Sequence, residues 1–364
     1  MTRRRWTLWT AAILLAGGLA VLDAFVRMHD AGASARDGVL SAMPPEASTV
    51  VFADLAELRR APFAADLYNW IPKSQADAEY ADFLRKTGFD YERDLDLTAI
   101  AVLKGEKESK LFAVAEGRFD RKKIEAYAAQ SGTRENRGGR EIFSLSLGDD
   151  ARKISFVFLS KDKIALTDAG DLAPFLGTVA NSTDARDWRE RFTRLAGSPL
   201  FAAMRQDAAA GDALASRTPG GFQSPQLSAL LNQLQWITLA AKPQDGGMRI
   251  VAEGECPNEQ ASRQLSDLLS GMLLMAEAGL NGPQTRRGLD PRIRDAYLEM
   301  IKGADVSRVD RGGTKSVRAV FDITSNFLNA VSTAPPPVPA SIAPTTPASK
   351  KPASRGRSQK AVRN

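Results

Sequence analysis

This sequence has very little of the chemistry that most enzymes and metalloproteins use. Its 364 residues include one cysteine, Cys256, and one histidine, His29. A single cysteine excludes an intramolecular disulfide and a cysteine metal cluster, and a single histidine leaves almost no room for general-base histidine chemistry. The sequence also lacks a G-x-S-x-G elbow, an H-E-x-x-H pair, a Walker A loop and a G-x-G-x-x-G fingerprint. We therefore predict a non-enzymatic protein with no catalytic residues, no cofactor and no metal site.

The folded body lacks the excess of positive charge that a nucleic-acid-binding protein needs. The formal net charge is +6, but residues 3–5 supply three basic side chains and residues 350–363 supply six. Without these nine, 40 basic residues stand against 43 acidic ones. The basic character belongs to the two ends, so we expect no nucleic acid to bind the folded body.

Long apolar runs are also scarce, and the clearest one is at the N-terminus. No charged residue occurs from Trp6 to Leu22, directly after three arginines. A basic flank before an apolar run is typical of a membrane helix whose N-terminus stays in the cytoplasm. We predict a cytoplasmic segment at 1–5, a transmembrane signal-anchor helix at 6–26 and a linker at 27–43. The protein would then be a single-pass inner-membrane protein with its body in the periplasm.

Cleavage is the alternative interpretation of this N-terminus. Ala33, Ser34 and Ala35 form an A-x-A site of the kind that signal peptidase cuts. This site lies more than ten residues past Leu22, and the apolar run is longer than a usual signal-peptide core. Both observations favour the uncleaved anchor.

Residues 44–180 have the pattern of a first α+β module. Apolar and β-branched runs separated by turn residues predict six strands, at 48–55, 97–103, 111–116, 141–147, 154–159 and 163–167. Helical periodicity is found between the first and second strands, and again after Asp120, a natural helix N-cap. The order of these elements is that of an antiparallel or mixed sheet with helices packed on one face.

A second module is predicted at residues 181–333 because several segments of the first recur in the same order. Val114-Ala-Glu-Gly117 is repeated as Val251-Ala-Glu-Gly254. The other matching blocks are 198–205 with 48–55, 236–241 with 97–103, Asn258 with Asp120, and 310–313 with 136–139. Such agreement over several blocks predicts an internal duplication.

The predicted fold class is therefore α+β, with two duplicated modules. Each module resembles an elaborated ferredoxin-like unit, and a more open meander with helices across one face is the alternative. The second module contains an expanded helical region in which residues 265–276 form a broad Leu- and Met-rich face. We expect this face to cover its own sheet, and binding of an apolar ligand or a partner helix is the alternative.

Two carboxylates are candidate polar cleft residues. Glu116 and Glu253 occupy the same position in the repeated four-residue segment. If their strands faced one another, the two carboxylates could line a common cleft and share a proton or a cation. A polar residue at the solvated end of a strand is the simpler interpretation.

The C-terminal residues 334–364 lack acidic side chains and are rich in Pro, Ala, Ser and Thr. Such a segment buries too little apolar surface to fold, so a disordered, partly polyproline tail is expected. Its basic end suggests contact with an envelope protein or an anionic polymer, and a solubilising tail is the alternative.

The segment Thr87-Gly-Phe-Asp-Tyr-Glu-Arg-Asp-Leu-Asp-Leu97, followed by an apolar strand and Glu116-Gly-Arg-Phe-Asp120, resembles a family of bacterial membrane-anchored envelope proteins known only as a domain of unknown function. The resemblance covers mostly residues 44–180. It implies an exported α+β protein and brings no catalytic residues with it.

These observations predict a membrane-anchored envelope protein that binds a protein or an apolar ligand. The first alternative is a periplasmic hydrolase that uses Glu116 and Glu253. The second is a passive spacer whose basic tail contacts the cell wall or lipid headgroups.

Overall fold

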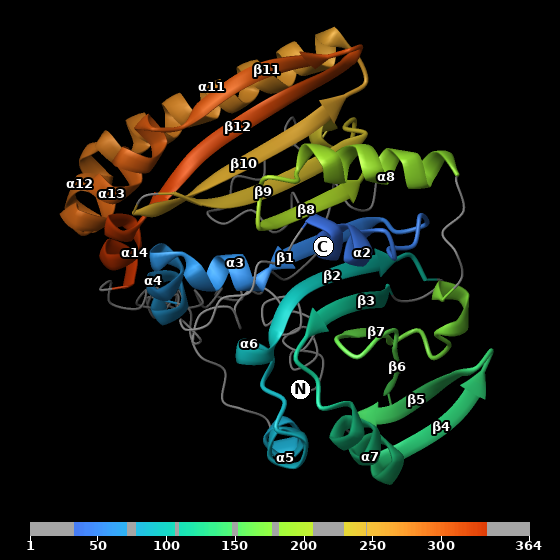
Figure 1. The fold of residues 1–364 in the computed structure, drawn as a ribbon. Helices are drawn as coiled ribbons and strands as arrows, with labels where there is room; N and C mark the ends of the chain where they lie inside the picture. Colours follow the sequence, from blue (N-terminus) through green and yellow to red (C-terminus); the bar gives the residue numbers. More distant parts are fainter. Residues whose placement is uncertain are drawn as a thin grey trace, which may run out of the picture.

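The computed structural model describes residues 33–70, 78–105, 109–147, 152–176, 182–206, 229–244 and 246–332. These residues form an α+β fold around one twelve-stranded sheet in which all neighbouring strands are antiparallel (Figure 1). The strand order is β11-β12-β10-β9-β8-β1-β2-β3-β7-β6-β5-β4.

The strands fall into two groups along the chain. The first group is β1 Thr49–Asp54, β2 Leu95–Leu103, β3 Lys110–Gly117, β4 Gly132–Arg137, β5 Arg140–Leu147, β6 Arg152–Phe158 and β7 Lys163–Thr167. The second group is β8 Leu200–Arg205, β9 Trp236–Gln244, β10 Gly247–Cys256, β11 Asp305–Arg311 and β12 Thr314–Thr324. All the predicted strands are present, and β4 and β11 are two additional ones that the sequence pattern did not indicate.

Most helices precede or connect these strands. Those of the first half are α2 Ala33–Leu40, α3 Leu55–Arg60, α4 Pro62–Trp70, α5 Ala78–Thr87, α6 Tyr91–Asp94, α7 Arg121–Ser131 and the short 3-10 helix η1 Ala173–Phe175. The second half contains α8 Thr183–Arg194, α11 Glu259–Asn281, α12 Pro283–Gly288, α13 Pro291–Lys302 and α14 Ser325–Ser332. The predicted caps Asp120 and Asn258 are confirmed, because each side chain accepts a hydrogen bond from a backbone N–H of the first helical turn.

The two halves meet at the β1–β8 pair, which has local two-fold character. Phe52 faces Phe201 there, and the partners on either side follow symmetrically. A row of facing residues crosses the six central strands in the palindromic order Val114, Ala99, Phe52, Phe201, Ala240 and Val251. The repeated Val-Ala-Glu-Gly segment therefore occupies equivalent places in β3 and β10.

The expectation of two separate sheets, each with helices on one face, needs correction. β1 and β8 pair along their length, so the halves share one sheet. An unpaired β1 would expose a row of backbone N–H and C=O groups, and pairing with β8 satisfies them. The meandering order of β1, β2 and β3 corresponds to the open meander predicted as the alternative.

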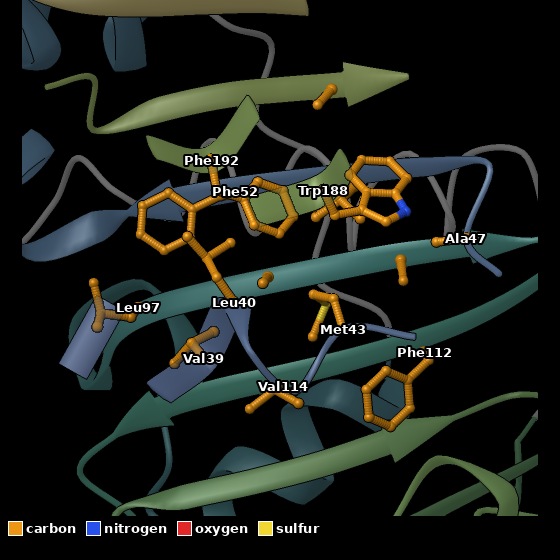
Figure 2. Close-up of a cluster of buried hydrophobic side chains, with 14 of the residues drawn as sticks. Val39, Leu40, Met43, Ala47, Phe52, Leu97, Phe112, Val114, Trp188 and Phe192 are labelled. Carbon is orange, nitrogen blue, oxygen red and sulfur yellow. The ribbon is translucent and has the colours of Figure 1, made fainter. Parts of the chain in front are cut away.

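Helices pack on both faces of the sheet. One face, called face A, carries Phe52 and Phe201 and is covered by α2 and α8, whose Val39, Leu40, Trp188 and Phe192 join the same buried cluster. Figure 2 shows the side chains of the two helices together with those of Met43, Phe52, Phe112 and Val114. The opposite face, face B, contacts α3, α4, α7, α11 and α14 through three further clusters. The cluster on face A draws on both halves, so the predicted modules 44–180 and 181–333 share a core.

The two Arg-Gly-Gly hairpins agree in local geometry and differ in position. The φ angles are 58° and 79° at Gly138 and Gly139, and 58° and 106° at Gly312 and Gly313. Positive φ at both central residues is what a type I′ hairpin turn requires. In the sheet, β12 lies next to β10, whereas β7 and β6 separate β3 from β5. The blocks therefore correspond in sequence order but not in sheet position.

The prediction that the apolar face of α11 covers the sheet is confirmed in part. Leu265 is buried on face B, and Leu268, Leu269 and Met272 pack around it. Further along the helix, Leu274 is 68% exposed and Met275 is 59% exposed. The apolar face predicted at 265–276 is therefore buried at its start and open at its end.

Within the part of the chain that the structure describes, no helix is both long and apolar enough to cross a membrane. The predicted span at 6–26 and the tail at 334–364 lie outside the described residues.

Gly117 makes a close backbone contact that predicts a large effect of substitution. A Cβ placed on Gly117 would lie 2.2 Å from the backbone oxygen of Asp94, where the β2–β3 register shifts between Leu95 and Leu97. The three nearest atoms all belong to the backbone of Asp94 and Leu95, so no flexible side chain can move away. We expect Gly117→Ala to lower the free energy of unfolding by about 1–3 kcal/mol in urea unfolding. Gly271→Ala is the control, because a Cβ there meets nothing within 4 Å inside α11, and it should raise stability by about 0.5–1 kcal/mol. Equal effects of the two substitutions would contradict the clash.

Candidate functional site

A cluster of charged side chains lies on face A where α8 crosses the second half of the sheet. Its centre is Glu255 of β10, which is only 2% exposed. The guanidinium of Arg191 donates to both of its carboxylate oxygens, at 3.2 Å from Nε and 2.5 Å from Nη2. Arg194 Nη2 donates to the same carboxylate. Burial of an unpaired carboxylate is very costly, so these two arginines fix where α8 docks.

Aromatic packing holds Arg191 in place from its other side. Its guanidinium carbon lies 4.2 Å from the ring centroid of Trp236, and Trp236 contacts Trp188 edge to face at 4.7 Å. A cation over an indole face is attracted by the ring quadrupole, more strongly when both are withdrawn from water. Aromatic packing and ion pairing therefore hold Arg191 in one position.

Glu253, two residues earlier on the same strand and face, binds a second group of arginines. Arg318 of β12 donates to Glu253 Oε2 from Nε at 3.2 Å and from Nη2 at 3.1 Å. Arg311 of β11 donates to both oxygens, with Nη2 at 3.0 Å from Oε2. Arg194 Nη1 is 3.8 Å from Glu253 Oε1, so this arginine links the two carboxylates.

The arginines and Glu253 line a cavity of about 230 Å³ between α8 and the sheet. Its polar lining consists of Arg194, Arg311, Arg318, Glu253, Thr238 and Ser198, and its apolar lining of Leu195, Ala240 and Val251. The wall contains three arginines and one glutamate, so its net charge is +2. Asp187 and Glu190 approach Arg191 only at 3.9 and 4.0 Å and are not part of this wall.

One hydrogen-bond donor of the cluster is buried without a partner. Among the described residues, nothing accepts from the buried Nε of Arg194. A buried unsatisfied N–H costs about 1–3 kcal/mol, so such a group calls for an explanation.

The pKa of Glu253 is lowered from its ordinary value of 4.5. Burial alone would raise this pKa, but hydrogen bonds and charge from Arg311 and Arg318 stabilise the carboxylate more strongly. Glu253 is therefore ionised at neutral pH.

This lowered pKa predicts a loss of stability in acid. The contribution of Glu253 is complete above its ordinary pKa of 4.5 and is lost as the pH falls through the lower folded value. We expect the free energy of unfolding to fall as the pH is lowered below about 5, with a smaller slope in Glu253→Gln than in the unchanged protein. Urea unfolding at several pH values measures these slopes, and identical slopes would contradict the assignment.

Glu116 and Glu253 do not meet in a common cleft. Both lie on face A, but β2, β1, β8 and β9 stand between β3 and β10. Five inter-strand steps of about 4.8 Å place their backbones roughly 24 Å apart. Glu116 is instead 3.4 Å from Lys163 of β7, the strand that corresponds in sheet position to β12. The two-carboxylate hydrolase therefore has no shared centre in this fold.

Sequence reasoning found Glu253 but missed the residues around it. Arg191 and Arg194 belong to α8, a helix that was not predicted. A signal for it was present, since Ser182 is an N-cap and Ala185, Trp188 and Phe192 fall on one helical face. Arg311 and Arg318 could be placed only by knowing that β12 pairs with β10.

Two other candidate chemistries find no support at this site. Cys256 is buried, and burial raises the pKa of its thiol to about 11, which opposes formation of a reactive thiolate. In the described ranges, no three His, Cys, Asp or Glu side chains are grouped as a metal site would require.

Comparison with known proteins gives only distant structural neighbours. No family model and no curated protein matches the chain. Solved structures of TP0453 in crystal forms III and I resemble it with TM-scores of 0.42 and 0.41 and identities of 9% and 8%. These matches cover 81% and 80% of this chain and 98% and 96% of TP0453. The resemblance is too weak to support an argument about function.

Proposed function

We propose that this chain is a non-enzymatic binding protein that is tethered to the inner membrane by residues 6–26 and works in the periplasm. Its ligand site is the cavity under α8. The observation that carries this proposal is the pre-organised wall of Arg194, Arg311 and Arg318, which opens into about 230 Å³ of space.

The contacts of α2 favour an uncleaved tether. Arg36 donates to the backbone oxygens of Leu195 at 2.9 Å and Ser198 at 3.3 Å. Its guanidinium carbon also lies 4.6 Å from the ring centroid of Phe52. Cleavage after Ala35 would remove the first turn of α2 and leave Arg36 as a mobile chain end. An intact N-terminus keeps these contacts and the membrane helix together.

The topology is tested with reporters. A periplasm-dependent reporter fused after residue 364 should be active, because the arginines at 3–5 hold the N-terminus in the cytoplasm. Reversal of this charge with Arg-to-Glu substitutions at 3–5 should reduce the activity. Activity of a cytoplasm-dependent reporter at the same position would contradict the proposed location.

We also infer that the two halves arose by duplication of a helix-plus-meander unit. In each half a helix on face A, α2 or α8, precedes three meandering strands. The palindromic row through Phe52 and Phe201 supports this inference, as does the equivalent placing of Glu116 and Glu253. In the second half, Arg194, Arg311 and Arg318 surround Glu253 and form the cavity wall with it.

The cavity itself is tested by filling it. Val251 lines the cavity and is only partly buried, so Val251→Phe should occupy the space without disturbing the strand. Native mass spectrometry of the full-length protein from its own membrane should show a small molecule bound to the unchanged protein and absent from Val251→Phe. Leu239→Phe is the control, because Leu239 lies on the neighbouring strand, is 39% exposed and does not line the cavity. The same bound mass in all three proteins would contradict the site.

The broader hypotheses remain predictions. An apolar ligand is not favoured at this cavity, because six of its nine lining residues are polar or charged. A protein partner, a tail that contacts an anionic polymer and a passive spacer are proposals that rest on the sequence alone.

A further inference from the structure

We propose that the ligand of the cavity under α8 is a small anion, with a carboxylate or phosphate group that binds Arg194, Arg311 and Arg318 and a short apolar part that faces Leu195, Ala240 and Val251. This inference rests on the proposed binding function and adds the chemical class of the ligand.

The first argument is charge. The wall contains three guanidinium groups and one carboxylate, and the deeper pair of Arg191 and Glu255 is neutral. An arginine stays protonated under all ordinary conditions, so the surplus of two positive charges cannot be removed by titration. An anion of charge −1 or −2 in the cavity would neutralise this surplus, whereas a cation would add to it.

The second argument is the supply of hydrogen-bond donors. Each guanidinium has five N–H groups, and Glu253 with its four lone-pair sites cannot satisfy three arginines, even though Arg194 also donates to Glu255. Arg318 uses Nε and Nη2 for Glu253, and Arg311 uses its two Nη atoms. Nε of Arg194 is buried and has no acceptor among the described residues. Planar donors that converge on one space are the usual means of binding carboxylate and phosphate oxygens.

The third argument is size. The volume of the cavity is about 230 Å³. It lies below the usual range of about 300–1,000 Å³ for sites that hold drug-sized ligands. The cavity therefore suits a small metabolite-like anion, and its three apolar lining residues allow a few carbon atoms beside the charged group.

Isothermal titration calorimetry of the full-length protein in detergent at low ionic strength tests this class. The probes are succinate and inorganic phosphate as anions, succinamide as the neutral analogue of succinate, and putrescine as a cation of similar length. We expect saturable binding of succinate or phosphate and none of succinamide or putrescine. Which of the two anions binds distinguishes a carboxylate site from a phosphate site.

Arginine variants connect the binding to the cavity. Arg318→Gln should weaken the binding of the anion by about 10- to 100-fold, since hydrogen bonds to charged groups contribute about 1.5–3 kcal/mol each. Arg249→Gln is the matched control, because Arg249 lies on the same face of β10, pairs with Asp322 and does not line the cavity. It should bind like the unchanged protein. If Arg318→Gln does not fold, Thr238→Val replaces it, because this change keeps the shape and removes a lining hydroxyl.

Three outcomes would overturn the proposal. Binding of an anion that is unaffected in Arg318→Gln, or equally weakened in Arg249→Gln, would place it elsewhere or make it nonspecific. Binding of succinamide or putrescine alone, abolished by Val251→Phe, would refute the anion and keep the proposed binding function. No binding of any probe, together with no bound mass lost in Val251→Phe, would refute both.

Discussion

Replacement of Glu255 by glutamine should lower the free energy of unfolding by about 3–5 kcal/mol. Glu255 is 2% exposed and binds both Arg191 and Arg194. Removal of its charge leaves two guanidinium groups beside a neutral amide in a site that water barely reaches. An intact buried ion pair contributes little more to stability than well-packed apolar residues would. Removal of one partner is nevertheless strongly destabilising, because the remaining charges stay desolvated.

Chemical unfolding in urea measures this loss, and Glu259→Gln is its control. Glu259 also contacts several basic residues, Arg263, Arg308 and Lys315, but its side chain is 45% exposed. Exposed ion pairs contribute about 0–1 kcal/mol each, so the control should change little. Similar losses in both variants would mean that burial does not set the strength of the Glu255 cluster.

The position of α8 provides a second readout of the same substitution. Since Arg191 and Arg194 are its charged contacts with β10, we expect the backbone amides of α8 to exchange faster with deuterium in Glu255→Gln. Amides of α7, on the opposite face, should keep their protection. Unchanged exchange in α8 would show that its apolar contacts alone hold it on the sheet.

Truncation of Phe52 or Phe201 to alanine should each lower stability by about 3–5 kcal/mol. These residues face one another at the β1–β8 pair, with ring centroids 5.1 Å apart, and both are nearly fully buried. They share the guanidinium of Arg36, which lies 4.6 Å from one ring centroid and 5.2 Å from the other. Either truncation leaves a cavity at the junction of the two halves.

A double-mutant cycle tests whether this junction couples the halves. The double variant should lose about 0.5–1.5 kcal/mol less than the sum of the single losses, because the stacking is already absent in each single variant. Leu239→Ala, at a position 39% exposed, is the control and should cost about 1 kcal/mol or less. Strictly additive losses, or separate unfolding transitions for the two halves, would contradict a shared core.

Much of the local structure followed from the sequence because its causes are local. Gly138-Gly139 and Gly312-Gly313 are turns whose cause is local, since few other residues adopt positive φ at two successive positions. Asp120 and Asn258 marked helix starts through contacts within three residues. Strands β4 and β11 were missed for the opposite reason: β4 is exposed and polar along its whole length, and each is a strand because it pairs with its neighbour, β5 or β12. Helix α8 was missed although its local signal was present in the sequence.

Of the residues that form the candidate site, only Glu253 could be predicted from the sequence. The repeat of Val-Ala-Glu-Gly pointed to Glu253, and it also suggested Glu116 as its partner. In the fold, Glu116 pairs with Lys163, and Glu253 contacts arginines from α8, β11 and β12 that lie 58 to 65 residues away in the chain. The pattern of a single strand contains no information about which distant helix covers it.

The sequence by itself thus determined most of the strands, the helix caps at Asp120 and Asn258, the equivalence of the two Val-Ala-Glu-Gly segments and the shortage of catalytic side chains. The tertiary structure decided that β1 and β8 join the halves into one sheet and that α8 carries two arginines to Glu255. Local structure depends on steric limits and short hydrogen bonds within a few residues. The single sheet depends on the burial of a strand edge, and the cavity depends on the burial of charges. Both kinds of burial require that segments distant in the sequence come together.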